Sequence, residues 1–431
     1  MKFIKQIIYD LKTQPVIGAV SIIGTAMAIM LIMVVMMIRQ IQVAPVAPES
    51  NRDRLLYEYG MCIQNDDNMG SSRLSMAAVD KLYGGLKTPE VISVMQSGCD
   101  QVDVSADGGE MMLADMRMTD ENMWKIFDHK FLSGKPYSEA DVLNGNRVVV
   151  ITESLARKLL GTPDAVGRTI TINQYPFKVV GVVRDVSPLM GWSYAQLWKP
   201  IKVSEGLSMS IGNGAADKYF GPFSVVSMAK TPEDVDEMRR EIRSRNASFN
   251  NELKADGWSR ADTGFPYVQE QVHALKGTNK EPDVSTERMV HYILIAIILL
   301  VPAINLSSMT QSRLRQRRHE IGVRRAFGAK RSSILRAILV ENLFVTLVGG
   351  LIGLILTFVM SYMFTSLFYE PAFSWTGYSV EMSLNASMLF SWSIFGWALL
   401  FCFVLNLLSA GIPAWRAAHV DPVEAINGIT K

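Results

Sequence analysis

The chain has 431 residues, 49% of them hydrophobic, and its 43 Lys and Arg nearly balance its 41 Asp and Glu, giving a formal net charge of +2. This overall charge says little about partners, because charge and hydrophobicity are distributed unevenly along the chain. Nucleic acid is not among the partners that we expect. Four windows are apolar and long enough to cross a bilayer, which takes about 20 residues. An entirely water-soluble protein is thereby excluded.

The N-terminal residues 1–14 are predicted to form an amphipathic helix in the membrane interface. Apolar side chains fall on one face at helical spacing, at Phe3, Ile4, Ile7, Ile8 and Leu11. A simple continuation of the first span is the alternative, which Pro15 opposes only weakly. The first span, 15–38, contains no charge, and its apolar core is longer than the 7–15 residues of a cleaved signal peptide. Small residues after Gln42 keep cleavage open as a second possibility.

Residues 39–288 read as one large α/β domain outside the membrane. Apolar runs rich in β-branched residues predict strands, and charged or amphipathic runs predict helices. The expected strands are 147–152, 169–172, 177–183 and 223–228, and the expected helices are 75–83, 153–160 and 232–245. The helix at 153–160 should stop at Gly161. The strands 169–172 and 177–183 should form a hairpin.

The predicted fold class is therefore a membrane protein with four transmembrane α-helices, one and then three, with the α/β domain inserted between the first and the second. The remaining segments are span 289–310, a basic loop 311–337, span 338–366, a short loop 367–386, span 387–412 and a tail 413–431. Pro302 is expected to kink the second span.

Lys and Arg in short loops predict the orientation in the membrane. Residues 311–336 contain nine Lys or Arg and one acidic residue, Glu320, whereas the loop 367–386 has no Lys or Arg. We therefore expect the basic loop and both termini in the cytoplasm. Residues 39–288 are expected in the periplasm of an inner-membrane protein.

Several common catalytic motifs are missing from the sequence. No G-x-x-x-x-G-K-[ST] phosphate loop occurs, and Ser133-Gly134-Lys135 is followed by Pro136, which lacks the backbone donor such a loop needs. No G-x-S-x-G motif occurs, and the five histidines form no zinc-binding motif. We therefore expect a non-catalytic chain without bound cofactor or metal. Cys402 should be a packing residue, and Cys62 and Cys99 could be free or bridged.

The predicted spans lack buried ionisable residues of the kind that ion-coupled transporters use. Asn305 and Asn406 are better explained by hydrogen bonds between helices than by ion binding. Gly349, Gly350 and Gly353 place small residues on the third span, which allows close helix contact between subunits or within one chain.

The basic loop carries a specific motif. It reads Glu320-Ile321-Gly322-Val323-Arg324-Arg325-Ala326, then Phe327, then Gly328-Ala329. This motif resembles the signature loop of FtsX-like, MacB-type ABC transporter permeases. Glu341 matches a family glutamate at the start of the next span, and 413–418 with Asp421-Pro422 and Ala425 resembles the closing motif of the family. Segments 148–160, 166–170 and 177–183 resemble its extracytoplasmic core, and 127–136 resembles versions common in Bacteroidetes.

The resemblance implies a permease dimer, of identical or closely related copies, above a dimer of ABC ATPases. MacB itself carries its ATPase on the same polypeptide, whereas only a few residues precede the first span here, so a separate ATPase subunit is expected to use ATP and Mg. The loop residues 320–329 would couple the two proteins, with apolar side chains docked in a groove and arginines held by charge. ATP-driven motion would then change the shape of the periplasmic domain. Membrane lipids, and possibly a periplasmic adaptor with an outer-membrane channel, are the other expected partners.

Three readings follow. The first is a subunit that exports or extracts an envelope substrate, such as an antibiotic, a peptide or a lipoprotein. The second is an FtsX-like regulator of an envelope enzyme or sensor, which transports nothing. The third is a membrane-anchored binding domain without an ATPase, whose arginines only set the topology and contact lipid headgroups.

Overall fold

The structure is a computed structural model. It describes residues 15–43, 45, 47–106, 108–188, 190–201, 214–261, 265–273, 282–286, 288–290, 292–294, 296–297, 300, 323, 327–363, 395–397, 399–400 and 403–404. The chain divides into two compact units. The membrane unit comprises Met1–Gln40, Thr286–Phe368 and Leu384–Lys431, and the outer domain comprises Ile41–Ser285 and Tyr369–Ser383.

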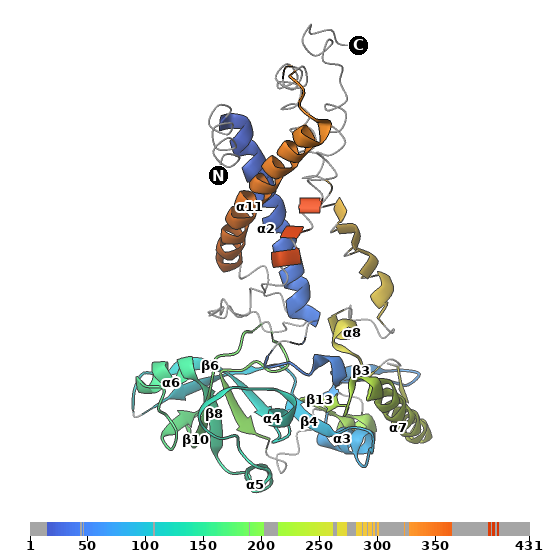
Figure 1. Cartoon of the computed structure of the whole chain (residues 1–431). Helices are drawn as coiled ribbons and strands as arrows, with labels where there is room; N and C mark the ends of the chain where they lie inside the picture. The colour runs from blue at the N-terminus through green and yellow to red at the C-terminus, as the bar shows by residue number, and fades with distance from the viewer. Residues whose placement is uncertain are drawn as a thin grey trace. The chain divides into compact units, whose positions relative to one another are not determined.

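The pairing of the strands joins them into one connected sheet in the outer domain, and several of these strands are labelled in Figure 1. Its strands are β1 (Leu55–Glu58), β2 (Met61–Gln64), β3 (Met69–Leu74), β4 (Val91–Gln96), β5 (Asp100–Ser105), β6 (Met112–Thr119), β7 (Phe131–Gly134), β8 (Val148–Thr152), β9 (Thr169–Ile172), β10 (Tyr175–Val183), β11 (Leu197–Pro200), β12 (Phe220–Gly221), β13 (Phe223–Met228) and β14 (Ser259–Arg260). Its helices are η1 (Arg52–Arg54), α3 (Met76–Tyr83), α4 (Met123–Ile126), α5 (Glu139–Leu143), α6 (Glu153–Leu160), η2 (Gly214–Tyr219), η3 (Pro232–Asp234), α7 (Val235–Ala255) and α8 (Gln269–His273). The predicted mixture of helices and strands is present.

Six strands close into a ring in the order β11-β8-β10-β9-β5-β6, because β11 pairs with both β8 and β6. The pairs β8–β10 and β6–β11 are parallel. Side chains of the ring strands form one core, which includes Val149, Ile151, Val179, Val182 and Leu197. Helix α6 adds Leu155 and Ala156 to this core. It begins after Thr152, whose side chain accepts a hydrogen bond from Leu155 N, and ends at left-handed Gly161.

Strand β6 also joins β4, and the sheet continues through β13, β3, β2 and β14. Helices α3 and α7 pack with these strands around a second core. The predicted helix 232–245 continues to Ala255, because Phe249 and Leu253 extend its buried face beyond Met238 and Ile242.

The hairpin between β9 and β10 has a shorter loop than the sequence suggests. Asn173 and Gln174 both have positive φ, 45° and 70°, so they form a two-residue turn that favours tight strand pairing. Tyr175 and Pro176 therefore belong to β10, paired with Ile172 and Thr171. Pro176 is tolerated although it cannot donate a ladder hydrogen bond.

The membrane unit contains two long described helices, α2 (Pro15–Val43) and α11 (Arg331–Met363). Each contains a window apolar enough to cross a membrane, Gly18–Met36 and Leu343–Met360. Helix α11 begins at Arg331, before the predicted start of the third span at 338. Described parts of the predicted spans 289–310 and 387–412 are helical. Residues 1–14, the loop 367–386, the tail 413–431, Pro302, Asn305, Asn406 and Cys402 lie outside the described residues.

Candidate functional site

Phe327, within the predicted coupling loop, presents an exposed aromatic side chain at a turn. The backbone N–H of Phe327 donates a hydrogen bond to the carbonyl oxygen of Val323, at 3.1 Å. Gly328 then adopts φ +88°, a left-handed conformation that commonly ends helices. A Cβ at Gly328 would meet no atom within 4 Å, so glycine is favoured there by its backbone freedom and not by a close neighbour.

Phe327 is 88% exposed, whereas Val323 is half-buried. Burying a phenylalanine side chain contributes about 1.5–3 kcal/mol, so a partner with an apolar groove would gain that much by covering it. Ala329 and exposed Lys330 follow, and α11 starts at once with Arg331. The remaining predicted coupling residues, Glu320, Ile321, Gly322, Arg324, Arg325 and Ala326, lie outside the described residues.

The exposed turn is followed, two residues later, by a long helix. Helix α11 is continuous over 33 residues, which corresponds to about 50 Å. About three turns of the helix precede the apolar window at Leu343. No proline interrupts α11 between its first turn and the apolar window. Glu341 lies in this part of α11.

The three predicted packing glycines lie on the apolar part of α11, and they face residues of the same chain. A Cβ at Gly349 would lie 2.8 Å from Thr25 Cβ, and a Cβ at Gly353 would lie 2.6 Å from the carbonyl oxygen of Ala26. Gly350 is less crowded, with Leu399 Cδ1 and Ile29 Cδ1 at 3.3 and 3.4 Å from the same position. These glycines therefore bring α11 into close contact with α2 within one chain.

The partners on α2 were not singled out from the sequence. Thr25 and Ala26 are 1% exposed and lie opposite Gly349 and Gly353. Ile29, Ile32 and Met33 continue this contact and pack with Leu354 and Phe395. The small pair Thr25-Ala26 within a long apolar run is the signal that could have identified this face of the first span.

The outer domain contains titratable groups with structural partners. Within the described part of the chain, no three His, Cys, Asp or Glu side chains come together in a way that could hold a metal ion. Asp120 accepts hydrogen bonds from Ser93 Oγ and Val94 N, both at 2.7 Å, and from Met123 N at 3.2 Å. Burial raises the pKa of Asp120 to about 7. These bonds hold the start of α4 against β4.

His129 and the two cysteines of the outer domain are also parts of the core. The His129 ring packs edge-on against Trp124 and Trp198, with centroids 5.2 and 5.0 Å away. Burial, with the nearby positive charge of Arg117, lowers the pKa of His129 to about 3, so the ring is neutral near pH 7. Neither Cys62 nor Cys99 is in a disulfide, and the Cys99 Sγ lies 3.2 Å from the carbonyl oxygen of Tyr194. The disulfide alternative does not hold in this structure.

Comparisons with known proteins agree with the architecture. The profile of the MacB-like periplasmic core domain matches residues 19–245, and the profile of the FtsX-like permease C-terminal domain matches residues 292–422. The uncharacterized ABC transporter permease YknZ of Bacillus subtilis is 25% identical over 299 residues, which cover 69% of this chain and 66% of YknZ. The macrolide export ATP-binding/permease protein MacB of Chromobacterium violaceum is 25% identical over 308 residues, 71% of this chain and 42% of that protein.

The matched segment thus spans less than half of the MacB relative and about two thirds of YknZ. Among solved structures, the periplasmic region of MacB from Actinobacillus actinomycetemcomitans aligns with 52% of this chain and 92% of that chain, at 17% identity and a TM-score of 0.35.

The two matched profiles account for both parts of the molecule, a membrane protein with a large extracytoplasmic domain. They confirm the resemblance that the motif around Arg324 and Arg325 indicates. The chain belongs to the family of ABC transporter permeases that join a MacB-like periplasmic core domain to an FtsX-like permease domain.

Proposed function

We propose that this chain is the permease subunit of a mechanotransmission-type ABC transporter. ATP hydrolysis by a separate cytoplasmic ATPase subunit moves the membrane helices, and the outer domain changes its position or shape in response. The substrate is exported or extracted from the periplasmic side of the membrane. The name of the MacB relative, a macrolide exporter, supports export over regulation as the outcome of this motion.

The observation that carries this proposal is the exposed Phe327 turn at the start of an unbroken helix. An ATPase that covers Phe327 gains apolar contact, and Arg324 and Arg325 beside it supply charge for an acidic rim. A displacement of the turn then moves α11 along its axis. Because Gly349 and Gly353 hold α11 against α2, the first span moves with it.

The coupling residues have separate roles in this proposal. Phe327, with Ile321 and Val323, provides the apolar contact, and Gly322 and Gly328 allow the tight backbone path. Arg324 and Arg325 hold the ATPase by charge, and Glu320, Ala326 and Ala329 complete the segment. Two permease copies on an ATPase dimer give the closing ATPase a matched pair of segments to displace.

Co-purification tests the proposal. The full chain, solubilised with its native partners, should retain an ATPase subunit that contains a phosphate-binding loop. The double change Arg325→Glu with Phe327→Ala should release this subunit, since it removes the apolar contact and reverses one charge. Leu143→Ala is the matched control, because Leu143 is also exposed, by 69%, but lies in the outer domain. Retention of the ATPase by the double variant would show that the docking assignment is wrong.

The identity of the transported material requires a second experiment. A strain lacking the chain should accumulate, or become sensitive to, one class among antibiotics, peptides and lipoproteins. If instead only the activity of an envelope enzyme changes, the chain regulates that enzyme through the same motion.

A further inference from the structure

Residues 48–273, the main part of the outer domain, have one short connecting segment at each end. The N-terminal connector, residues 48–54, begins shortly after Val43, the last residue of α2. The C-terminal connector, residues 265–273, includes α8 and precedes the predicted second span. In the proposed function, movement of the spans is passed to the outer domain through these connectors. The contacts that the connectors make therefore determine which parts of the outer domain move with the spans.

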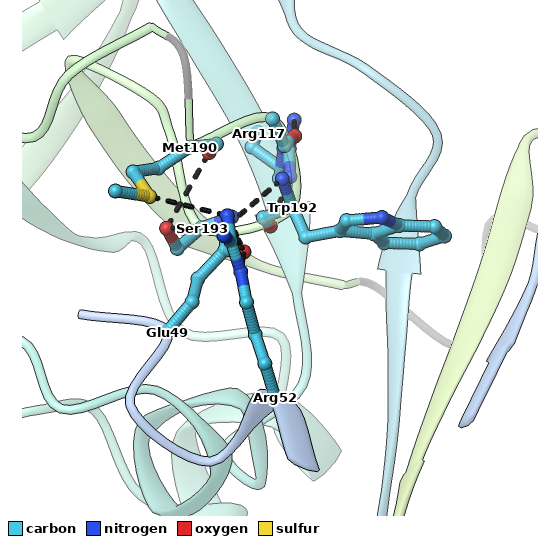
Figure 2. A network of polar contacts seen from close by, with 7 residues as sticks. Glu49, Arg52, Arg117, Met190, Trp192 and Ser193 are labelled. Carbon is cyan, nitrogen blue, oxygen red and sulfur yellow. Dashed lines mark hydrogen bonds and ion pairs between the residues drawn. The ribbon is translucent and has the colours of Figure 1, made fainter. Parts of the chain in front are cut away.

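The N-terminal connector is fastened by a buried ion pair. Glu49 and Arg52 have side chains only 0% and 1% exposed, and Arg52 Nη2 lies 2.8 Å from Glu49 Oε2. The other carboxylate oxygen, Oε1, accepts hydrogen bonds from Ser193 N at 3.0 Å, Ser193 Oγ at 2.9 Å and Trp192 N at 3.3 Å. Figure 2 shows both side chains meeting the turn that contains Met190, Trp192 and Ser193. A charge this deeply buried needs such partners, so Glu49 ties the connector firmly to the turn.

The same turn is held from its other side by a strand of the sheet. Arg117, on β6 and 3% exposed, donates hydrogen bonds to the carbonyl oxygens of Trp192 and, at 2.8 Å, of Gly191. Strand β6 pairs with β5 and β11 in the ring and also with β4. It therefore links the ring to the strands that pack with helices α3 and α7. The path from Glu49 through the turn to Arg117 therefore ends on the strand that both parts of the outer domain share.

The C-terminal connector is fastened to the same place. Tyr57 on β1 exchanges two backbone hydrogen bonds with Tyr267, of 2.8 and 2.9 Å. The Tyr57 ring packs on Trp192, with centroids 4.7 Å apart. Beside it on β1, Glu58 pairs with Arg260 at 3.1 Å, with both side chains almost fully buried. Strand β1 thus connects the segment that leaves the outer domain with the turn that Glu49 holds.

We propose that Glu49, Arg52, Tyr57, Trp192 and Tyr267 form a connector joint, which moves the outer domain as one body when the membrane helices move. Both connectors meet at Trp192, one through the Glu49 hydrogen bond to its backbone and the other through the Tyr57 ring. A displacement of either span consequently acts on one point of the sheet. These residues are positioning residues, and the inference rests on the proposed function, in which an ATPase drives the helices.

The test measures the movement of the outer domain relative to the membrane. The full chain and its ATPase subunit are reconstituted in vesicles with an acceptor-labelled lipid, and a donor dye is placed at exposed Asp164 through Asp164→Cys, with the native cysteines replaced by alanine. ATP and Mg should change the energy transfer in the otherwise unmodified chain. Glu49→Gln should abolish this change while ATPase binding and ATP hydrolysis persist, because the connector still exists but its ion pair is broken.

Ser193→Ala is the milder variant, for use if Glu49→Gln does not fold. It removes one donor to Glu49 and keeps the ion pair, so a partial loss of the energy-transfer change is expected. Two control variants should keep the full change. Lys81→Met breaks the exposed Lys81–Glu252 ion pair. Tyr137→Phe removes a buried hydroxyl that is hydrogen-bonded to Thr119. Neither residue lies in a connector.

The outcomes separate the two proposals. A full ATP-dependent change in folded Glu49→Gln and in Ser193→Ala, with the ATPase bound, overturns the connector joint and leaves the proposed function standing. No ATP-dependent change in the unmodified chain, or no bound ATPase, overturns the proposed function and the joint together.

Discussion

Gly353 on α11 lies against Ala26 on α2 so closely that a Cβ at position 353 would be 2.6 Å from the Ala26 carbonyl oxygen. Because that neighbour is backbone, it cannot turn aside as a flexible side chain would, and the helices themselves must separate to accept a larger residue. This relationship connects the exposed Phe327 turn to the first span.

Gly353→Ala should therefore destabilise the helix pair by about 1–3 kcal/mol, the usual cost of overpacking a close contact. The measurement is thermal unfolding of the full chain in detergent. Gly396→Ala is the matched control, because a Cβ there meets nothing within 4 Å. Equal melting temperatures for Gly353→Ala and the unmodified chain would argue against close contact of α2 and α11.

Gly328 tests the geometry of the turn. With φ +88°, replacement by an L-residue such as Ala or Val costs about 1–2 kcal/mol in this conformation. Gly328→Val should weaken ATPase binding more than Gly328→Asn, since Asn tolerates the left-handed region better than a β-branched residue does. Binding of the purified ATPase to immobilised permease provides the comparison. Identical affinities for both variants would exclude a role for this backbone conformation in docking.

Asp120 predicts a pH dependence of stability. Burial raises its folded-state pKa to about 7, above the unfolded value of about 3.9, so the folded chain binds more protons than the unfolded chain between these values. The contribution of Asp120 to the free energy of unfolding should therefore increase by on the order of 1–4 kcal/mol as the pH falls from about 7 to about 4. Asp120→Asn should flatten that part of the profile.

Denaturant unfolding at several pH values, followed by fluorescence, measures this effect. The difference between the unmodified chain and Asp120→Asn isolates Asp120 from other titrating groups. A pH profile that is the same in both chains, or one that rises with pH only in the unmodified chain, would contradict the assignment.

Much of the local structure could be predicted from the sequence, because it depends on neighbours in the chain. The run 153–160 has a capping Thr152 before it and Gly161 after it, and α6 occupies that range. Strands β8, β9 and β13 also follow their apolar runs. The predicted helix ends at 245, short of the observed end of α7 at Ala255, because the charged residues at 236–245 hide the apolar spacing that continues to Leu253.

Contacts between distant segments could not be predicted in this way. Closure of the ring depends on β11 pairing with both β6 and β8, and no local pattern specifies that pairing. Glu49 and Ser193 are 144 positions apart, and each resembles an ordinary loop residue in the sequence. The coupling motif is identified by resemblance alone, since arginines in a short loop would otherwise indicate only topology.

The orientation predicts which positions a membrane-impermeant thiol reagent can reach. In spheroplasts, a cysteine at exposed Asp164 should react at once, whereas a cysteine at exposed Lys330 should react only after the membrane is permeabilised. Fast reaction of Lys330→Cys in intact spheroplasts would place the coupling turn outside the cell and exclude a cytoplasmic ATPase as its partner.

Photo-crosslinking from position 327 tests the docking of the ATPase most directly. A photoreactive phenylalanine analogue replaces Phe327 in the full chain, and the same analogue replaces exposed Leu143 in the control. Irradiation of cells should join the position-327 variant to an ATPase subunit that carries a phosphate-binding loop, identified by mass spectrometry, and the control should give no such product. Adducts at position 327 with lipid alone, or with proteins that lack an ATPase domain, would contradict the proposed coupling.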